Sequence, residues 1–177
     1  NSIIKRYSNI QLPGGITKTN LTNALLTSSP RALKVSPYTT SSSLLLVGTV
    51  LGDLLKVENA NTASPTWTEI SGPSFVGSIS DIEFGTNENE IFVTMHNYSV
   101  VSIWYTSDGG ATWANKEGDF PDIPVKTILQ NPLNTDEVII GTELGVWKTS
   151  NFKDATPNWT HSFNGMSNVK VLDLNLR

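Results

Sequence analysis

The run YTSDGGATW, residues 105–113, decides the fold of this chain. It places two glycines, an aspartate and a tryptophan within nine positions. Gly109 and Gly110 tolerate backbone angles that other residues avoid in a tight hairpin turn. The carboxylate of Asp108 can accept hydrogen bonds from backbone N–H groups of that turn, and Trp113 offers a large apolar surface. The run therefore predicts a turn between two strands whose tryptophan packs between sheets.

The same pattern recurs along the chain. Trp67, Trp113 and Trp159 are spaced 46 residues apart, and each follows a turn that contains Thr or Asn. The segments LVGTVLGDLLKV (46–57) and IIGTELGVWKTS (139–150) are two versions of one element. Further apolar positions keep the spacing of 46, namely Ile79, Val125 and Val171, and Ile82, Ile128 and Leu174. Agreement at this many positions indicates a structural repeat.

Each unit of the repeat is typical of four short strands. Residues that favour strands lie between Gly, Pro, Asn and Asp, and no apolar pattern keeps a helical period. A unit of four antiparallel strands that repeats every 40–50 residues is typical of a β-propeller blade. Propellers need about four to eight blades, whereas 177 residues hold fewer than four. The sequence therefore predicts an all-β fold, an incomplete arc of a larger propeller.

We expect one propeller segment, 1–177, divided by its repeats. Residues 1–28 would be the outer part of a preceding blade, and residues 168–177 the first strand of a following blade. Between them we expect three blades, the middle one carrying the complete turn motif, at 29–74, 75–122 and 123–167. The remaining blades of the same propeller are then expected as partners, because a single small sheet cannot bury both its faces.

Residues 106–113 resemble the Asp-box, or bacterial neuraminidase repeat, of pattern Ser/Thr-x-Asp-x-Gly-x-Thr-Trp. The match is complete once and degenerate near Trp67 and Trp159. The resemblance implies a structural role at the periphery of the blade. A catalytic or calcium-binding Asp108 is the alternative, but one carboxylate lacks the oxygen ligands that calcium needs. The motif residues are Thr106, Asp108, Gly110, Thr112 and Trp113.

The composition excludes several classes of function. The net charge of −4 provides no basic patch for nucleic acid, and no apolar run approaches the ~20 residues that span a bilayer. The absence of cysteine removes disulfides, thiol catalysis and Cys-ligated zinc. With two histidines, a histidine-rich metal site is not expected. No phosphate-cradling glycine loop is present, so we expect neither metal nor cofactor.

Loops at one face of a propeller, around its central channel, are the candidate ligand site. The loop MHNYSVV (95–101) is the longest of the loops between second and third strands. It combines an aromatic ring, an imidazole and an amide, which suits a sugar or a peptide, although an ordinary solvated loop is the plainer interpretation. The candidate ligand-binding residues on this face are His96, Asn97, Tyr98, Glu143 and Phe120.

Three carboxylates are weak catalytic candidates. Asp119 and Asp122 flank a Phe-Pro pair and could act together in glycoside hydrolysis, which needs two carboxylates facing across a sugar. The stretch GDFPD (118–122) is also typical of a turn, because Gly, Asp and Pro favour turns. Asp53 lies in another loop on the same expected face. The arginine triad and Tyr–Glu nucleophile of sialidases are not visible in this sequence.

The resemblance implies a non-catalytic, extracytoplasmic module of a larger secreted or cell-surface bacterial protein, located outside the cell or, alternatively, in the periplasm. Such a module would bind or display a protein, peptide or glycan ligand through its channel-face loops; the family includes sortilin-like receptors. One alternative is a fragment of a xyloglucanase-like or sialidase-like glycoside hydrolase. A second alternative is a structural spacer or the cargo of a secretion system.

Overall fold

The computed structural model describes residues 3–11, 13–162, 165 and 169–176. Within these ranges the chain forms fourteen strands and no helix, which confirms the prediction of an all-β fold. No helix that could cross a membrane occurs in this part of the chain. The strands make one two-stranded and three four-stranded sheets, in which every pairing is antiparallel and joins consecutive strands.

The four sheets follow one another along the chain. The half-sheet pairs β1 (Ile4–Ser8) with β2 (Thr17–Leu21). The first sheet contains β3 (Pro30–Val35), β4 (Leu45–Thr49), β5 (Leu54–Glu58) and β6 (Thr66–Glu69). The second contains β7 (Ile79–Phe84), β8 (Ile91–Met95), β9 (Ile103–Thr106) and β10 (Ala114–Asn115). The third contains β11 (Val125–Gln130), β12 (Val138–Thr142), β13 (Gly145–Thr149) and β14 (Thr160–Ser162).

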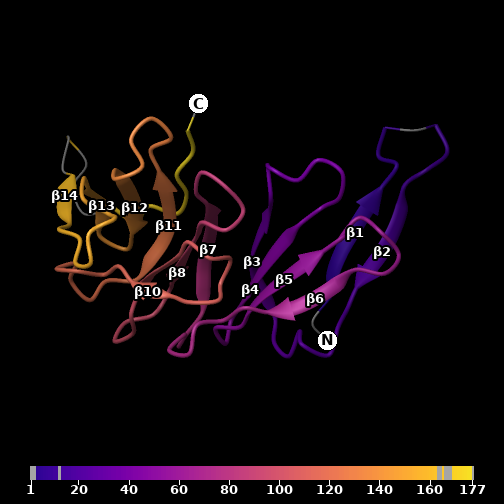
Figure 1. The fold of residues 1–177 in the computed structure, drawn as a ribbon, viewed down its shortest axis with the longest axis horizontal. Helices are drawn as coiled ribbons and strands as arrows, with labels where there is room; N and C mark the ends of the chain where they lie inside the picture. Colours follow the sequence, from indigo (N-terminus) through magenta and orange to yellow (C-terminus); the bar gives the residue numbers. More distant parts are fainter. Residues whose placement is uncertain (1–2, 12, 163–164, 166–168, 177) are drawn as a thin grey trace.

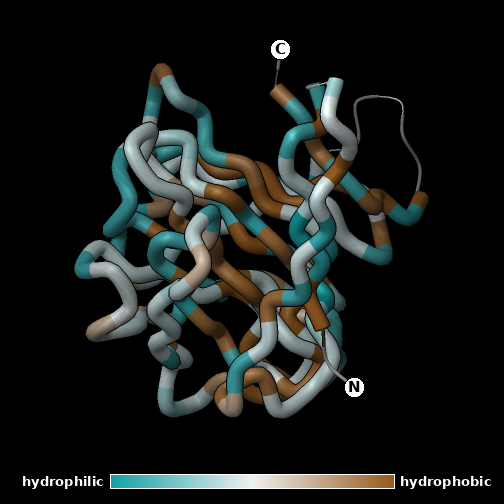
Figure 2. The backbone as a smooth tube through the Cα atoms, turned by 90° about the vertical axis from the view of Figure 1, so that its right-hand side faces the viewer, coloured by the Kyte–Doolittle hydropathy of each residue, from teal (hydrophilic) through white to brown (hydrophobic). Residues whose placement is uncertain are grey.

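The sheets lie side by side and bury apolar side chains between them (Figure 1). The first strands of neighbouring sheets are in contact, β3 with β7 and β7 with β11. One apolar cluster fills each of the three spaces between successive sheets. Figure 2, which views the molecule from the side of the half-sheet, shows apolar stretches running through the interior and hydrophilic stretches in the loops. Burial between stacked sheets is therefore the main source of stability.

The first strand of each four-stranded sheet carries a bulge at the same place. Its register against the second strand shifts by one residue at Arg31, Ser80 and Lys126. A bulge redirects the extra side chain out of the regular alternation. Ser80 uses this freedom to donate a hydrogen bond to the backbone oxygen of Val125 in the next sheet, at 2.7 Å. The bulges therefore help to join neighbouring sheets.

The repeated tryptophans occupy equivalent positions, as predicted. The indole N–H of Trp113 donates to the backbone oxygen of Ile70 at 2.8 Å, and that of Trp159 to the oxygen of Lys116 at 3.1 Å. Each acceptor lies just after the last strand of the preceding sheet. Trp67 packs against the cluster beneath the half-sheet. Trp113 and Trp159 therefore anchor their sheets to the preceding one through a hydrogen bond, and Trp67 contacts the preceding half-sheet's cluster through packing.

The turn at 106–113 is held together by its own side chains. The Asp108 carboxylate accepts hydrogen bonds from the Thr106 hydroxyl at 2.7 Å and from the Thr112 backbone and hydroxyl at 2.9 and 2.6 Å. The Thr106 hydroxyl accepts one from the Gly110 N–H at 3.1 Å. Gly109 and Gly110 have φ angles of 73° and 94°, which glycine adopts without strain. The aspartate is therefore a structural residue of the turn.

The third sheet builds the corresponding turn around an amide. Asn151 Oδ1 accepts hydrogen bonds from the Thr149 hydroxyl at 2.8 Å and from the Asn158 N–H at 3.0 Å. An asparagine oxygen can therefore replace one carboxylate oxygen in this arrangement. The difference is that the amide carries no charge and does not titrate.

Asp108→Asn should keep the fold but remove an acid-sensitive contribution to stability. Hydrogen bonds from Thr106 and then Thr112 hold the pKa of Asp108 well below its usual 3.8. Because this pKa is depressed in the folded state, the ionised Asp108 carboxylate adds to the free energy of unfolding. This addition is present in full above pH 3.8 and is lost as the pH falls further. Urea unfolding at pH 7, 4 and 2 should therefore show a wild-type advantage that shrinks towards pH 2. Asp173→Asn, at an exposed carboxylate, is the control; an advantage independent of pH would contradict this role.

The C-terminal segment does not form the strand that the sequence predicts. Of the predicted strand at 168–177, residues 169–176 are described, and they form no strand. Two backbone hydrogen bonds nevertheless attach this segment to the third sheet, from Gly145 N to Val169 O and from Val171 N to Thr142 O. No strand in the described part of the chain forms a ladder with residues 169–176.

Candidate functional site

Loops from successive sheets meet at one end of the stack, which we call the loop face. Here the loop between the second and third strands of the second sheet contacts both the connection that leads into that sheet and the connection that leads to the next one. In the second sheet, Asn97 Oδ1 accepts a hydrogen bond from Ser78 N, and Asp122 Oδ1 accepts one from Ser99 N, both at 2.7 Å. The loop face consists of residues 50–53, 70–78, 96–102, 116–124, 143–144 and 169–171.

The loop at 96–102 holds Tyr98 in solvent between two fixed points. On one side the His96 N–H donates to the backbone oxygen of Ser78 at 2.9 Å. On the other side Ser99 adopts a left-handed φ of 60° and is bound to Asp122. The side chain of Tyr98 is 59% exposed. A loop fixed on both sides presents an aromatic ring with little loss of conformational entropy on binding.

Lys126 joins two of the predicted ligand-binding residues. It is the bulge residue of β11, and its ammonium is buried. The ammonium contacts both ring nitrogens of His96, with Nε2 at 2.9 Å, and forms an ion pair with Glu143. The second carboxylate oxygen of Glu143 pairs with Lys170 at 3.0 Å. The hydrogen bond from Lys126, with support from Lys170, lowers the pKa of Glu143. The structure therefore brings His96 and Glu143 into one network.

Two acidic residues, Glu117 and Asp122, bind the backbone of the loop at 96–102. Glu117 accepts a hydrogen bond from Ser102 N at 2.8 Å and is half-buried. Burial raises the pKa of Glu117, and the nearby charge of Asp122 raises it further, against the hydrogen bond from Ser102. A carboxyl group with a raised pKa close to a second carboxyl group is a pattern found in acid catalysis and in purely structural networks.

Phe120 is a core residue and not a surface ligand contact. Its ring is buried against Trp147 and Trp159, with centroid distances of 5.3 and 6.0 Å. Phe75, in the preceding connection, packs in the same way on two tryptophans of the second sheet, at 5.3 and 4.9 Å. The two phenylalanines therefore belong to the repeat, and each closes the apolar space under a connection.

The remaining acidic candidates are held by their neighbours. Asp119 accepts a hydrogen bond from Trp159 N in the third sheet at 2.6 Å, whereas Asp122 bonds to the second sheet, so the two carboxylates have different partners. Asp53 Oδ2 accepts three hydroxyl hydrogen bonds at 2.9, 3.3 and 3.1 Å, from Thr27, Ser28 and Thr49. In the described residues, no group of three His, Asp or Glu side chains could hold a metal ion.

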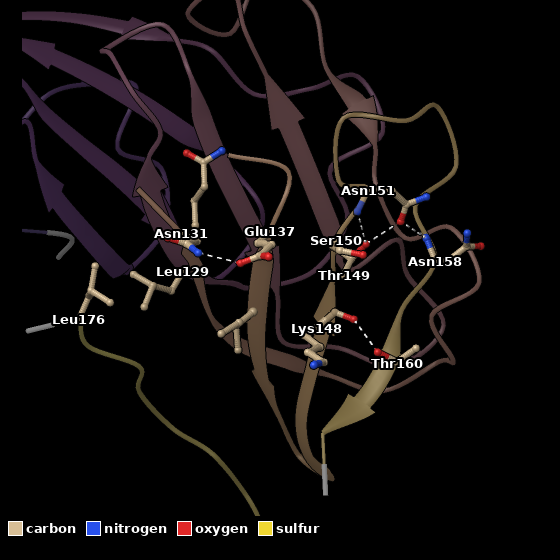
Figure 3. A pocket seen from close by; sticks show the side chains of 12 residues that line it. Leu129, Asn131, Glu137, Lys148, Thr149, Ser150, Asn151, Asn158, Thr160 and Leu176 are labelled. Atoms are coloured by element: carbon tan, nitrogen blue, oxygen red, sulfur yellow. Dashed lines mark hydrogen bonds between the residues drawn. The ribbon is translucent and has the colours of Figure 1, made fainter. Parts of the chain in front are cut away.

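A hollow of about 590 Å³ lies on the outward side of the third sheet, away from the loop face (Figure 3). Figure 3 shows polar side chains along it, among them Asn131, which donates to Glu137 at 2.7 Å. Ile139 of β12 is exposed here, whereas Leu46 and Phe92, each also the second residue of its strand, are fully buried. The hollow is therefore a sheet face that lacks the neighbour present elsewhere, and no predicted site residue lines it.

Sequence reasoning missed Lys126, which contacts the loop face from β11, and Glu117, which belongs to the loop face. The first interacts through a bulge and the second through a connection that folds beneath a loop, so neither stands in a recognisable local motif. Ser78 is a third case, because its hydroxyl oxygen is buried with no hydrogen-bond partner in the described structure. No protein-family model and no curated protein matches the chain.

Proposed function

We propose that the chain is an arc of an Asp-box β-propeller that acts as a binding module. In this proposal each four-stranded sheet is a blade, and the loop face is the face around the channel. The repeated Trp anchors, the repeated bulges and the self-contained Asp108 turn support it. The module would belong to a larger bacterial protein that is secreted or displayed on the cell surface, with further blades completing the ring.

The ligand would be a peptide or a glycan bound around Tyr98. The observation that carries this proposal is the exposed Tyr98 ring on a loop fixed at both sides, beside the His96–Lys126–Glu143 network. An aromatic face stacks on a sugar ring or an apolar side chain, and the neighbouring charged groups orient the polar part of the ligand. Asp53 and Asp119 are occupied in hydrogen bonds, which favours binding over catalysis.

The test is a screen of the chain against a glycan array and a displayed peptide library. Tyr98→Ala should weaken any selected ligand by at least about tenfold, because an exposed aromatic anchor is a typical binding hot spot. Tyr7→Ala removes another exposed tyrosine, on β1, and should leave affinity unchanged. Equal affinity of the wild type and Tyr98→Ala would exclude this site. Absence of any ligand would favour the spacer or cargo alternative.

One observation favours the glycoside hydrolase alternative, and the same screen examines it. Glu117 and Asp122 accept hydrogen bonds from the backbone of one loop, from Ser102 N and Ser99 N, and the charge of Asp122 contributes to the raised pKa of Glu117. Products released from an array glycan, and their loss in Glu117→Gln, would replace the binding proposal with an enzyme. Binding without turnover would support the module.

A further inference from the structure

The loop face exposes a row of apolar side chains. In each four-stranded sheet the loop between the second and third strands carries one, and these are Leu51, Tyr98 and Leu144 in chain order. The connections beside these loops add Val76 and Val169. All five side chains are between 43% and 68% exposed. Exposed apolar residues scattered singly are ordinary, but a group of them on one face marks an interaction site.

The segments that carry these side chains touch one another in chain order. A Cβ placed on Gly52, next to Leu51, would lie 3.1 Å from the backbone oxygen of Gly77, next to Val76. The hydrogen bonds of Asn97 and Asp122 described above join the middle loop to the connections on both its sides. Two backbone hydrogen bonds continue the row, from Glu143 N to Pro124 O at 3.2 Å and from Gly145 N to Val169 O at 2.8 Å. The apolar side chains therefore form one continuous line across the three sheets.

The spacing of this line matches one conformation of an extended polypeptide. Packed sheets lie about 10 Å apart, so the loops of successive sheets are separated by about that distance. A chain in the polyproline II conformation presents a side chain in the same direction every third residue, over about 9 Å. A β-strand does so every second residue, over about 7 Å. A polyproline II chain therefore places one side chain at the loop of each sheet.

The charge of the loop face adds a second requirement. Asp119 and Asp122 are exposed, and they lie in the connection between the loops of Tyr98 and Leu144. The loop face contains five Asp or Glu and two Lys, and Lys126 contacts it from β11, so these groups carry a net charge of −2. Charge complementarity therefore favours a ligand with basic residues.

A polypeptide fits this face better than a glycan does. Four of the five exposed side chains are aliphatic, and Tyr98 is the one aromatic ring among them. Sugar hydroxyls buried against aliphatic groups without hydrogen-bond partners cost free energy. The Asp53 carboxylate and the Asn97 amide oxygen, moreover, already accept hydrogen bonds from the protein. Apolar peptide side chains bury the same surface without that cost.

We propose that the loop face binds an extended polypeptide in the polyproline II conformation, with an apolar residue at every third position and basic residues between them. This inference rests on the proposed function, because it names the class of ligand for the same face. The peptide would lie across all three sheets, with its apolar side chains on Leu51, Tyr98 and Leu144 and a basic side chain beside Asp119 and Asp122.

The probe is a synthetic peptide of Leu-Pro-Lys repeats, titrated into the whole chain by calorimetry. It should bind at least about tenfold more tightly than two control peptides. Ser-Pro-Lys repeats keep the charge and conformation but lack the apolar residues, and Leu-Pro-Lys-Pro repeats keep the leucines but move them to every fourth position. Equal affinity of the three peptides would overturn the proposal, because neither the apolar residues nor their spacing would then matter.

The protein variant Leu51→Ser/Leu144→Ser should weaken binding of Leu-Pro-Lys repeats by at least about tenfold. Both side chains are exposed, so the variant should fold, and circular dichroism checks this. Leu133→Ser changes an exposed leucine in a turn at the opposite end of the third sheet and should leave affinity intact. Equal affinity of the wild type and the double variant would overturn the proposal.

Two further outcomes would also overturn it, and they leave different conclusions. A glycan ligand that depends on Tyr98, with no binding of Leu-Pro-Lys repeats, would remove this inference but keep the proposed function. Binding of phosphatidylcholine vesicles that Leu51→Ser/Leu144→Ser abolishes would show that the apolar row contacts a lipid surface instead. Failure of the proposed function itself is recognised separately, because neither a glycan nor any peptide would then bind.

Discussion

Trp159→Ala should lower the free energy of unfolding by about 3–5 kcal/mol, the range for removing a large aromatic side chain from a core. The indole is buried between the second and third sheets, with Phe120 and Phe152 at centroid distances of 6.0 and 6.3 Å. Alanine would leave a cavity at this interface. It would also leave the buried backbone oxygen of Lys116 without the indole N–H that now satisfies it.

Urea unfolding followed by far-ultraviolet circular dichroism measures this effect, because tryptophan fluorescence changes with the substitution itself. Trp159→Phe separates the two contributions, since it keeps an aromatic ring but removes the N–H, and should cost about 1–3 kcal/mol. Leu133→Ala, at a 94% exposed residue, should stay within about 0.5 kcal/mol of the wild type. A loss below about 1 kcal/mol in Trp159→Ala would mean that the indole does not anchor the sheets.

The sequence was sufficient to predict the strands and the role of the repeated tryptophans. Both depend on local patterns, namely turn residues between short apolar runs and a spacing of 46. Asp108 was predictable for the same reason, because all its partners lie within the turn. The absence of a strand at 169–176 was not predicted, since strand formation depends on a neighbouring strand and not on the apolar pattern alone.

The candidate site was only partly predictable. The sequence singled out His96 and Glu143 but not Lys126, which lies between them, because the contact depends on the stacking of two sheets and on a bulge. Phe120 was misread as a surface residue because its loop carries Gly, Asp and Pro. The repeat contained a corrective signal, since Phe75 precedes Trp113 much as Phe120 precedes Trp159, but the spacing differs by one residue from 46.

Gly118→Ala should destabilise the chain by about 2–4 kcal/mol, the sum of a left-handed backbone cost and a steric clash. Gly118 has a φ of 55°, which side chains rarely adopt. A Cβ placed on it would lie 1.9 Å from the backbone oxygen of Pro157, so one of two chain segments would have to move. Those segments also form the hydrogen bond from Trp159 N to Asp119, at 2.6 Å. The clash would therefore disturb the site where Trp159 is anchored.

Gly14→Ala is the matched control, because a Cβ there meets no atom within 4 Å. We expect it to change stability by less than about 0.5 kcal/mol. The comparison uses urea unfolding of both variants under the same conditions. In addition, Gly118→Ala combined with Trp159→Ala should cost less than the sum of the two single changes, since both loosen the contact between the connection at 116–124 and the third sheet. Equal stability of Gly118→Ala and Gly14→Ala, or strict additivity in the double variant, would show that the contact between the connection at 116–124 and the third sheet does not couple the second and third sheets.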